Sequence, residues 1–255
     1  MSAQYISNVL IDKLLNESKP AEKVELSKII KGKDFNDILS KEDLERKICG
    51  SNGYLKNLHD VASKLNIPNL KSYYKEVIYF DKIDKLKFNY NEAKRISLKY
   101  TLELEQKIIL HLLEKSYDSL NEVDKENFDK ELQKVIQTHG ETSNKNLVGT
   151  AGLLALGNMG GFATYTFLTS AMSVLSFGTL SFGAYTAATS MLSVVLGPVG
   201  WTALGIWAIF KLGQPNYKEL IPIVLTVGLI RQRIMFENKE VFNDSLFDKF
   251  LNLFK

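Results

Sequence analysis

The middle of this chain is free of charge. From Asn146 to Phe210 it contains no Asp, Glu, Lys, Arg or His, whereas the residues on either side are dense in Lys and Glu. The run is about 65 residues long, roughly three times what one helix needs to cross a bilayer. This contrast predicts either contact with a membrane or a core that is as apolar as one.

Two breaks divide the run into a helical hairpin. Gly and Ser punctuate the segment 176–183, which predicts a turn. A second break falls at Gly197-Pro198, because proline disfavours helical geometry in the residue before it. We therefore expect one arm near residues 147–175 and a second near 184–210, kinked at Pro198.

The tryptophans within the hairpin and the lysines that flank it indicate contact with lipid. Trp201 and Trp207 lie towards the Lys211 end, where an interfacial aromatic belt would place them. Lys145, Lys211 and Lys218 flank the run and fit a cytoplasmic side under the positive-inside rule. The residues expected to contact the membrane are Leu153, Leu156, Phe162, Phe167, Leu168, Leu192, Val195, Leu196, Trp201, Ile206, Trp207 and Phe210.

A buried core is the alternative interpretation, because helices that are hydrophobic all round also occupy the centre of large helical proteins. An intermediate case joins the two: amphipathic helices would sheathe the hairpin in water and release it at a bilayer. Small residues such as Gly157 and Gly161, spaced four apart, allow close helix crossings in either setting.

Residues 1–145 read as successive amphipathic helices. Apolar residues recur at helical spacing up to Pro20, which is well placed to begin the second helix. Ser40 followed by Asp43 resembles a capping box. The longest helix is expected from about residue 91 to 120, and a second from 122 to 137 with Asn121 as its N-cap.

After the hairpin, residues 214–255 are expected to return as helices. The apolar segment 220–230 is too short to span a bilayer alone and predicts a helix packed on the domain, with Pro222 in its first turn. Arg231 and Arg233 follow it, and an aromatic-rich amphipathic helix ends the chain. The sequence thus predicts an all-α protein with three parts: 1–145, 146–213 and 214–255.

No catalytic, cofactor-binding or metal-binding constellation emerges from the sequence. The 32 basic and 29 acidic residues give a net charge of +3, which is not the strongly basic field of nucleic-acid binders. His111 and Glu114 lie one turn apart but lack further metal ligands. Glu103 and Glu105 point to different helix faces, so a general acid–base pair is not indicated. The single cysteine, Cys49, reads as structural.

Several stretches together resemble the YaaW family of bacterial proteins. They are Gly50-Ser51-Asn52, residues 73–78 and 81–86, Leu102-Glu103-Leu104-Glu105-Gln106 with Ile109-Leu110, residues 197–201, and Tyr217 through Ile221-Pro222 to Arg231 and Arg233. The resemblance implies a helical protein with a hydrophobic central region. It implies no enzymatic activity, cofactor or functional residue.

The functional interpretation is a non-enzymatic bacterial protein that associates with or inserts into the cytoplasmic membrane. Its partner would be the lipid bilayer, with self-association and perturbation of the membrane as further options. The N-terminus has no basic segment followed by an apolar run, so a secretory signal peptide is not expected. The rival is a soluble scaffold or chaperone-like binding protein that buries the hairpin as its core.

Overall fold

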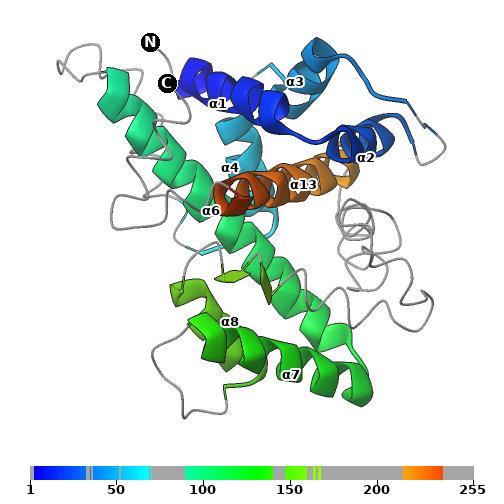
Figure 1. Cartoon of the computed structure of the whole chain (residues 1–255), viewed down its shortest axis with the longest axis vertical. Coiled ribbons are helices and arrows are strands. Elements are labelled where there is room, and N and C mark those ends of the chain that lie inside the picture. Colours follow the sequence, from blue (N-terminus) through cyan, green and yellow to red (C-terminus); the bar gives the residue numbers. More distant parts are fainter. Residues whose placement is uncertain are drawn as a thin grey trace.

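The structure, a computed structural model, describes residues 3–32, 35, 37–51, 53–68, 70, 90–139, 147–159, 163–164, 166–167 and 215–237. Over these ranges the regular structure is helical throughout, which confirms the all-α prediction (Figure 1). The helices are α1 (Ala3–Glu17), α2 (Pro20–Lys31), α3 (Lys41–Cys49), α4 (Tyr54–Lys64), α6 (Tyr90–Ser119), α7 (Glu122–His139), α8 (Gly149–Asn158) and α13 (Pro215–Glu237).

Local signals set several helix starts as the sequence predicted. Pro20 is the first residue of α2, where its missing N–H leaves no helical bond unmade. Ser40 Oγ accepts the backbone N–H of Asp43 at 3.1 Å, and Asn121 Oδ1 accepts that of Asp124 at 2.9 Å. Each cap satisfies one of the N–H groups that a helix leaves unpaired at its start.

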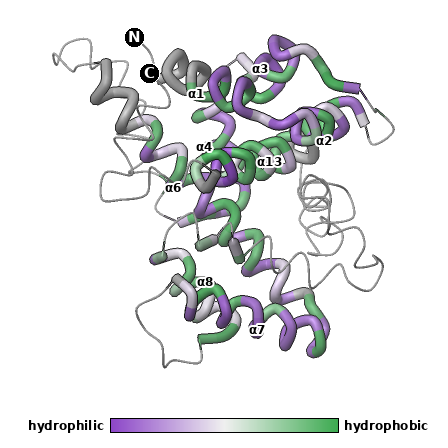
Figure 2. The backbone as a smooth tube through the Cα atoms, viewed as in Figure 1, coloured by the Kyte–Doolittle hydropathy of each residue, from purple (hydrophilic) through white to green (hydrophobic). Residues whose placement is uncertain are grey.

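Helix α6 is the spine of the described fold. Helices α1, α4 and α13 pack along one part of it and α8 along another, while α7 packs on α8 (Figure 1). Hydrophobic and hydrophilic residues alternate along α6 and α7, as expected of helices with one buried face (Figure 2). The buried faces of all eight described helices meet in one hydrophobic cluster, whose members include Leu58, Ile108, Phe128 and Val227.

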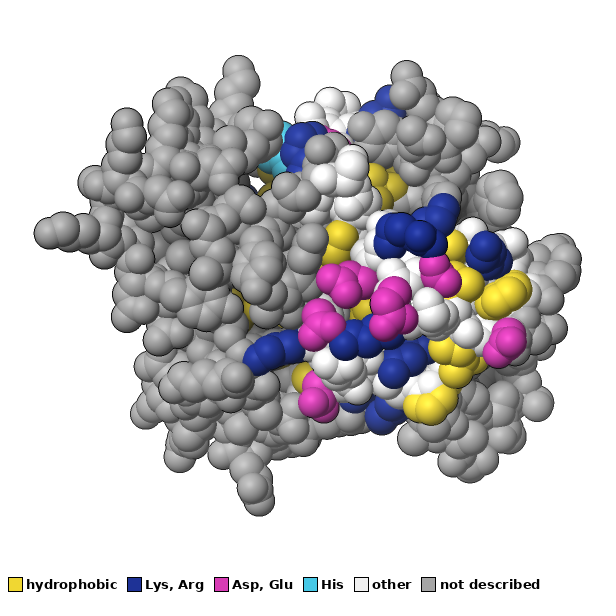
Figure 3. All heavy atoms as spheres, turned by 90° about the horizontal axis from the view of Figure 1, so that it is seen from above, with side chains coloured by type: hydrophobic (Ala, Val, Ile, Leu, Met, Phe, Trp, Pro, Cys, Tyr) yellow, Lys and Arg dark blue, Asp and Glu magenta, His cyan; other side chains and the backbone are white. Residues whose placement is uncertain are grey.

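The outer surface of the first three helices is charged and mixed in sign. Seen from above, acidic and basic side chains are interspersed with scattered hydrophobic ones (Figure 3). Lys41 of α3 pairs with Asp12 of α1, and Arg46 pairs with Asp43 within α3. Exposed pairs of this kind contribute little to stability, so the surface mainly keeps this side in water.

The charge-free run begins as part of the common core. Leu153, Leu156 and Phe167, three of the residues expected to contact lipid, are 4%, 0% and 0% exposed. The ring of Phe167 meets that of Phe128 edge-on, with 4.8 Å between centroids. The other nine, Phe162, Leu168, Leu192, Val195, Leu196, Trp201, Ile206, Trp207 and Phe210, lie outside the described residues, so their contact with a membrane stays a prediction.

Helix α8 approaches its neighbours closely at two glycines. A Cβ on Gly157 would lie 2.8 Å from Leu110 Cδ1 of α6, and one on Gly152 would overlap the side chain of Leu132 on α7. The small residues of the run therefore seat α8 on the charged helices, a close helix crossing made within the protein.

Helix α13 starts earlier than predicted. It begins at Pro215, so Pro222 lies inside the helix, and the prediction that it occupies the first turn was wrong. Pro215 and four polar or aromatic residues precede the apolar segment that begins at residue 220, and they extend the helix towards its N-terminus. An interior proline removes one helical hydrogen bond, and the packing of α13 on α2, α4 and α6 outweighs that loss.

Both predicted boundaries, 145/146 and 213/214, lie outside the described residues, and the three-part division stays a prediction. None of the helices in the described ranges is both long enough and apolar enough to cross a membrane.

The seating of α8 yields a stability prediction. Replacing Gly152 by Ala should lower the free energy of unfolding by about 1–3 kcal/mol, because the new methyl group overlaps Leu132 and lies 2.8 Å from the backbone oxygen of Leu147. Gly228→Ala on α13 is the matched control: its Cβ would lie 3.5 Å from that of Glu105, an ordinary contact. Urea unfolding followed by circular dichroism measures both, and equal stability of the two variants would contradict the close crossing.

Candidate functional site: a buried polar centre and an open cleft on helix α6

Helix α6 carries a carboxylate in the middle of its buried face. Glu105 is 1% exposed, and both of its oxygens accept the Nε–H of Arg231 on α13, at 3.1 and 3.0 Å. The hydroxyl of Tyr54 on α4 donates to the same carboxylate at 2.8 Å. One ion pair with its phenol partner thus joins three helices that are distant in sequence.

Burial dominates the electrostatics of this centre. It raises the pKa of Glu105, while the charge of Arg231 and the hydrogen bonds from Tyr54 and Arg231 oppose that rise. The pKa of Tyr54 is raised as well, first by burial and then by the neighbouring carboxylate. Because all three side chains are at most 1% exposed, they cannot meet a substrate, and their role is to hold α4, α6 and α13 together.

A second buried ion pair holds α13 at another point. Arg233 donates through Nε and Nη2 to the two oxygens of Glu22 on α2, at 2.6 and 2.8 Å. Its Nη2 also donates to the backbone oxygen of Glu17, at the end of α1, at 3.1 Å. Helix α13 is therefore tied by charge both to α6 and to the α1–α2 corner.

Sequence reasoning missed these pairs. Glu105 was weighed only against Glu103, as a general acid–base pair, and the lysine-rich and glutamate-rich helices were interpreted as solvated surface. The available signal was the position of Glu105 seven residues from both Leu98 and Leu112, which places it on the apolar face of α6. A charge inside an apolar stripe predicts a buried partner, but nothing in the sequence indicates which of the many Arg and Lys residues that partner is.

The Glu105–Arg231 pair makes a double-mutant cycle informative. Arg231→Met alone should cost about 3–5 kcal/mol of unfolding free energy, because it leaves the Glu105 carboxylate buried without its counter-charge. Adding Glu105→Gln should recover most of that loss, since the amide oxygen still accepts from Tyr54. Chemical unfolding of the single and double variants gives the coupling energy; losses that simply add would contradict a direct buried pair.

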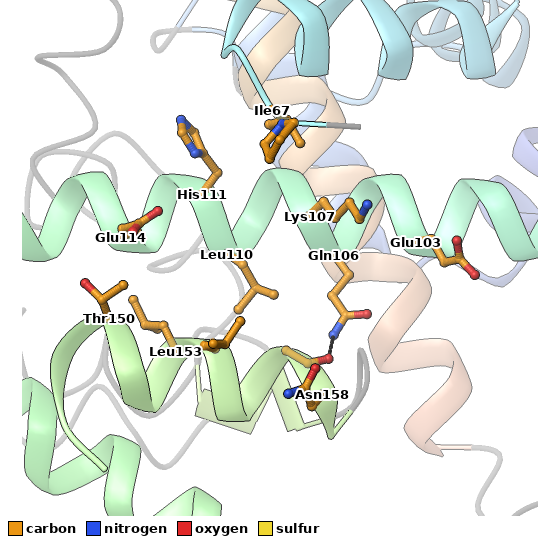
Figure 4. Close-up of a pocket in the computed structure, with 13 residues that line it drawn as sticks. Ile67, Glu103, Gln106, Lys107, Leu110, His111, Glu114, Thr150, Leu153 and Asn158 are labelled. Carbon is orange, nitrogen blue, oxygen red and sulfur yellow. Dashed lines mark hydrogen bonds between the residues drawn. The ribbon is translucent and has the colours of Figure 1, made fainter. Parts of the chain in front are cut away.

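A cleft of about 380 Å³ opens on another side of α6. Figure 4 shows it bounded by α8 on one side and by Ile67, just after α4, on the other. The lining residues are Ile67, Pro68, Glu103, Gln106, Lys107, Leu110, His111, Glu114, Thr150, Leu153, Leu154, Gly157 and Asn158. The base is apolar and the margins are polar, which is the usual composition of a small-ligand site.

Hydrogen bonds fix one wall of the cleft, and an exposed leucine stands at its opening. The Gln106 amide donates to the backbone oxygen of Gly157 at 2.8 Å and to Thr164 Oγ1 at 3.3 Å, which holds the start of the charge-free run against α6 (Figure 4). Leu154 is 70% exposed at the opening, a large apolar side chain in contact with water. The cleft is thus preformed on one wall and has an apolar surface available at its mouth.

The imidazole of His111 lines this cleft and is biased towards its neutral form. Burial lowers its pKa from the ordinary 6.5, the nearby charge of Lys115 lowers it further, and Glu114 opposes both. His111 and Glu114, one turn apart on α6, both line the cleft. Within the described ranges, no group of three His, Cys, Asp or Glu side chains is placed to hold a metal ion.

The lowered pKa of His111 gives a pH prediction. The folded state prefers the neutral ring, so its contribution to stability is complete above pH 6.5 and is lost as the pH falls from there through the lowered pKa of His111 in the folded state. His111→Gln should therefore flatten the decline in unfolding free energy between about pH 7 and 5. His59→Gln is the parallel case, because burial also lowers the pKa of His59. Curves that stay parallel to that of the unmodified chain would contradict this assignment.

Cys49 is buried and free, and burial raises the pKa of its thiol to about 12. At neutral pH the thiolate is therefore scarce, which agrees with the structural role that the sequence predicted.

The chain is similar in sequence to a known bacterial protein. The chain is 30% identical over 172 residues to the UPF0174 protein of Helicobacter pylori (strain J99 / ATCC 700824), an alignment that covers 66% of this chain. It spans 64% of the length of that relative, whose name specifies no activity, substrate or partner. No family model matches the chain, and no solved structure matches it.

Proposed function

We propose that this protein is a non-enzymatic, membrane-associated bacterial protein whose run 146–210 contacts the lipid bilayer of the cytoplasmic membrane through the part that follows α8. The described helices are its water-facing body. We also propose that it belongs to the YaaW family. The similarity to the bacterial UPF0174 protein supports a bacterial origin, and three of the residues that carry the resemblance, Glu105, Arg231 and Arg233, form buried ion pairs.

The observation that carries the proposal is the charge-free run together with the way its two ends are held. Helix α8 lies at its start and α13 begins just after its end, and both pack on α6. A hairpin that crosses a bilayer an even number of times leaves and returns on the same side. Both of its ends can then stay attached to α6, through α8 and α13. Between these two attachments, residues 159–210 carry no charge, and these 52 residues are enough for two helical arms.

The rival function, a soluble scaffold or chaperone-like binder, also has a specific observation in its favour. Leu153, Leu156, Ala163 and Phe167 are at most 4% exposed, so the described start of the run is enclosed by the protein itself. If the rest of the run continued in the same way, the hairpin would be a core rather than a membrane segment.

An environment-sensitive label separates the two functions. The nitrobenzoxadiazole fluorophore is attached to a cysteine introduced by Leu192→Cys or Ile206→Cys in the run, with Val123→Cys on α7 as the matched control because Val123 is 68% exposed. Cys49 can stay, since a buried thiol with a pKa of about 12 takes up little label at pH 7. Vesicles of phosphatidylethanolamine and phosphatidylglycerol should brighten and blue-shift the two run labels and leave the α7 label unchanged.

Lipids that carry a quencher in their acyl chains should then dim the run labels only. A label at residue 192 or 206 that is already bright without vesicles and does not respond to the quencher would favour the scaffold and overturn membrane contact. Vesicle flotation of the unlabelled chain checks that the label itself does not drive binding. Release of an encapsulated dye from the same vesicles tests the further option that the protein perturbs the membrane.

A further inference from the structure

The cleft on α6 is not used by the proposed membrane contact. It lies against the described start of the run, is lined by residues of α6, α8 and the segment after α4, and is open to water beside Leu154. A preformed cavity with an apolar base and polar margins is a place where a ligand gains apolar burial and directed contacts together. The remaining question is the chemistry of its occupant.

Size favours a small molecule over a protein. The cleft has 13 lining residues and a volume of about 380 Å³. A stable protein–protein interface needs roughly 20–30 residues on each side, whereas ligand pockets run from about 300 to 1,000 Å³. The cleft falls at the lower end of the ligand range and short of an interface.

The apolar base favours a straight hydrocarbon chain. Leu110 of α6 and Leu153 of α8 point into the space between the two helices (Figure 4). Leu154 also lines the cleft and is 70% exposed. Gly157 also lines the cleft, with Leu110 packed against it. A linear chain lies along such an apolar base, where each buried methylene group favours binding.

The charges at the margin favour a cationic head. Two carboxylates, Glu103 and Glu114, and one ammonium, Lys107, line the cleft, so the charge of the lining is −2 + 1 = −1. Glu103 is already 3.9 Å from the ammonium of Lys99. Glu114 stands next to His111 towards the other end of the cleft (Figure 4). Lys115, whose charge also acts on His111, does not line the cleft, so Glu114 is the charged group that a cation would meet there.

We propose that this cleft binds a small single-chain amphiphile with a cationic head, with the chain over Leu110, Leu153 and Leu154 and the head beside Glu114. Binding there does not depend on the proposed membrane function, because every residue involved belongs to the described helices or the segment after α4.

Histidine ring signals of the full-length chain report on the cleft directly. Decyltrimethylammonium is titrated below its micelle concentration into ¹³C-histidine-labelled protein, with decyl sulfate and decyl maltoside as the anionic and neutral counterparts. The signal of His111, assigned with His111→Gln, should shift and saturate, while that of His59, which does not line the cleft, should stay in place. Decyltrimethylammonium should bind at least about fivefold tighter than decyl sulfate, the effect of one favourable charge contact.

Two substitutions and a control locate the site. Leu154→Ser should weaken decyltrimethylammonium about tenfold through loss of apolar contact, and Glu114→Gln should remove the preference over decyl sulfate. Val123→Ser, at a similarly exposed branched aliphatic residue on α7, should change nothing.

Three results would overturn the proposal: a His111 signal that never saturates, binding that is indifferent to Leu154→Ser, or decyl sulfate that binds as tightly as the cation. A basic amphipathic peptide that saturates the His111 shift while the decyl compounds do not would overturn it in favour of a peptide ligand. Failure of vesicle binding in the label experiment leaves this result unaffected, so the two proposals fail separately.

Discussion

The contact between Glu105 and Arg231 constrains the arrangement of the described helices more than any other. Desolvating two charges is expensive, and attraction in a low-dielectric interior offsets that cost only when the geometry is close. Here Arg231 Nε lies at 3.0 and 3.1 Å from the two carboxylate oxygens, and the hydroxyl of Tyr54 supplies a second donor. Because a shift of α13 by one turn would leave both charges buried and unpaired, the pair fixes the register of α13 on α6 as well as its presence there.

Different forces hold the two ends of the charge-free run. At the start of the run, close packing holds α8. Gly152 and Gly157 let its backbone approach α7 and α6, where Leu132 and Leu110 lie against these glycines. After its end, α13 is held by apolar packing together with the Glu105–Arg231 and Glu22–Arg233 pairs. Apolar packing tolerates small displacements, whereas paired buried charges do not. The position of α13 is therefore fixed more tightly than that of α8.

The sequence was a good guide where a local rule sufficed. Pro20, Ser40 and Asn121 each marked a helix start, and the helices expected near 91–120 and 122–137 match α6 and α7. It failed where the deciding partner was remote. The mates of Glu105 and Glu22 lie 126 and 211 residues away, and no periodicity reveals them. The cleft was equally hidden, because it forms only when α8 is placed beside α6.

The burial of α8 also limits how a membrane-contacting state can be reached. Undocking this helix would remove Leu153 and Leu156 from the core, at about 1.5–3 kcal/mol for each side chain if they met water. Contact with lipid would offset this cost for the two leucines, but not for the surfaces of α6 and α7 that they leave. Leu132 of α7 and Leu110 of α6 would face water instead, at a cost of similar size. Since a domain of this kind is stable by only about 5–15 kcal/mol, that exposure would consume much of its stability. The proposed contact with lipid is therefore best served when α8 stays docked and the residues beyond it reach the bilayer.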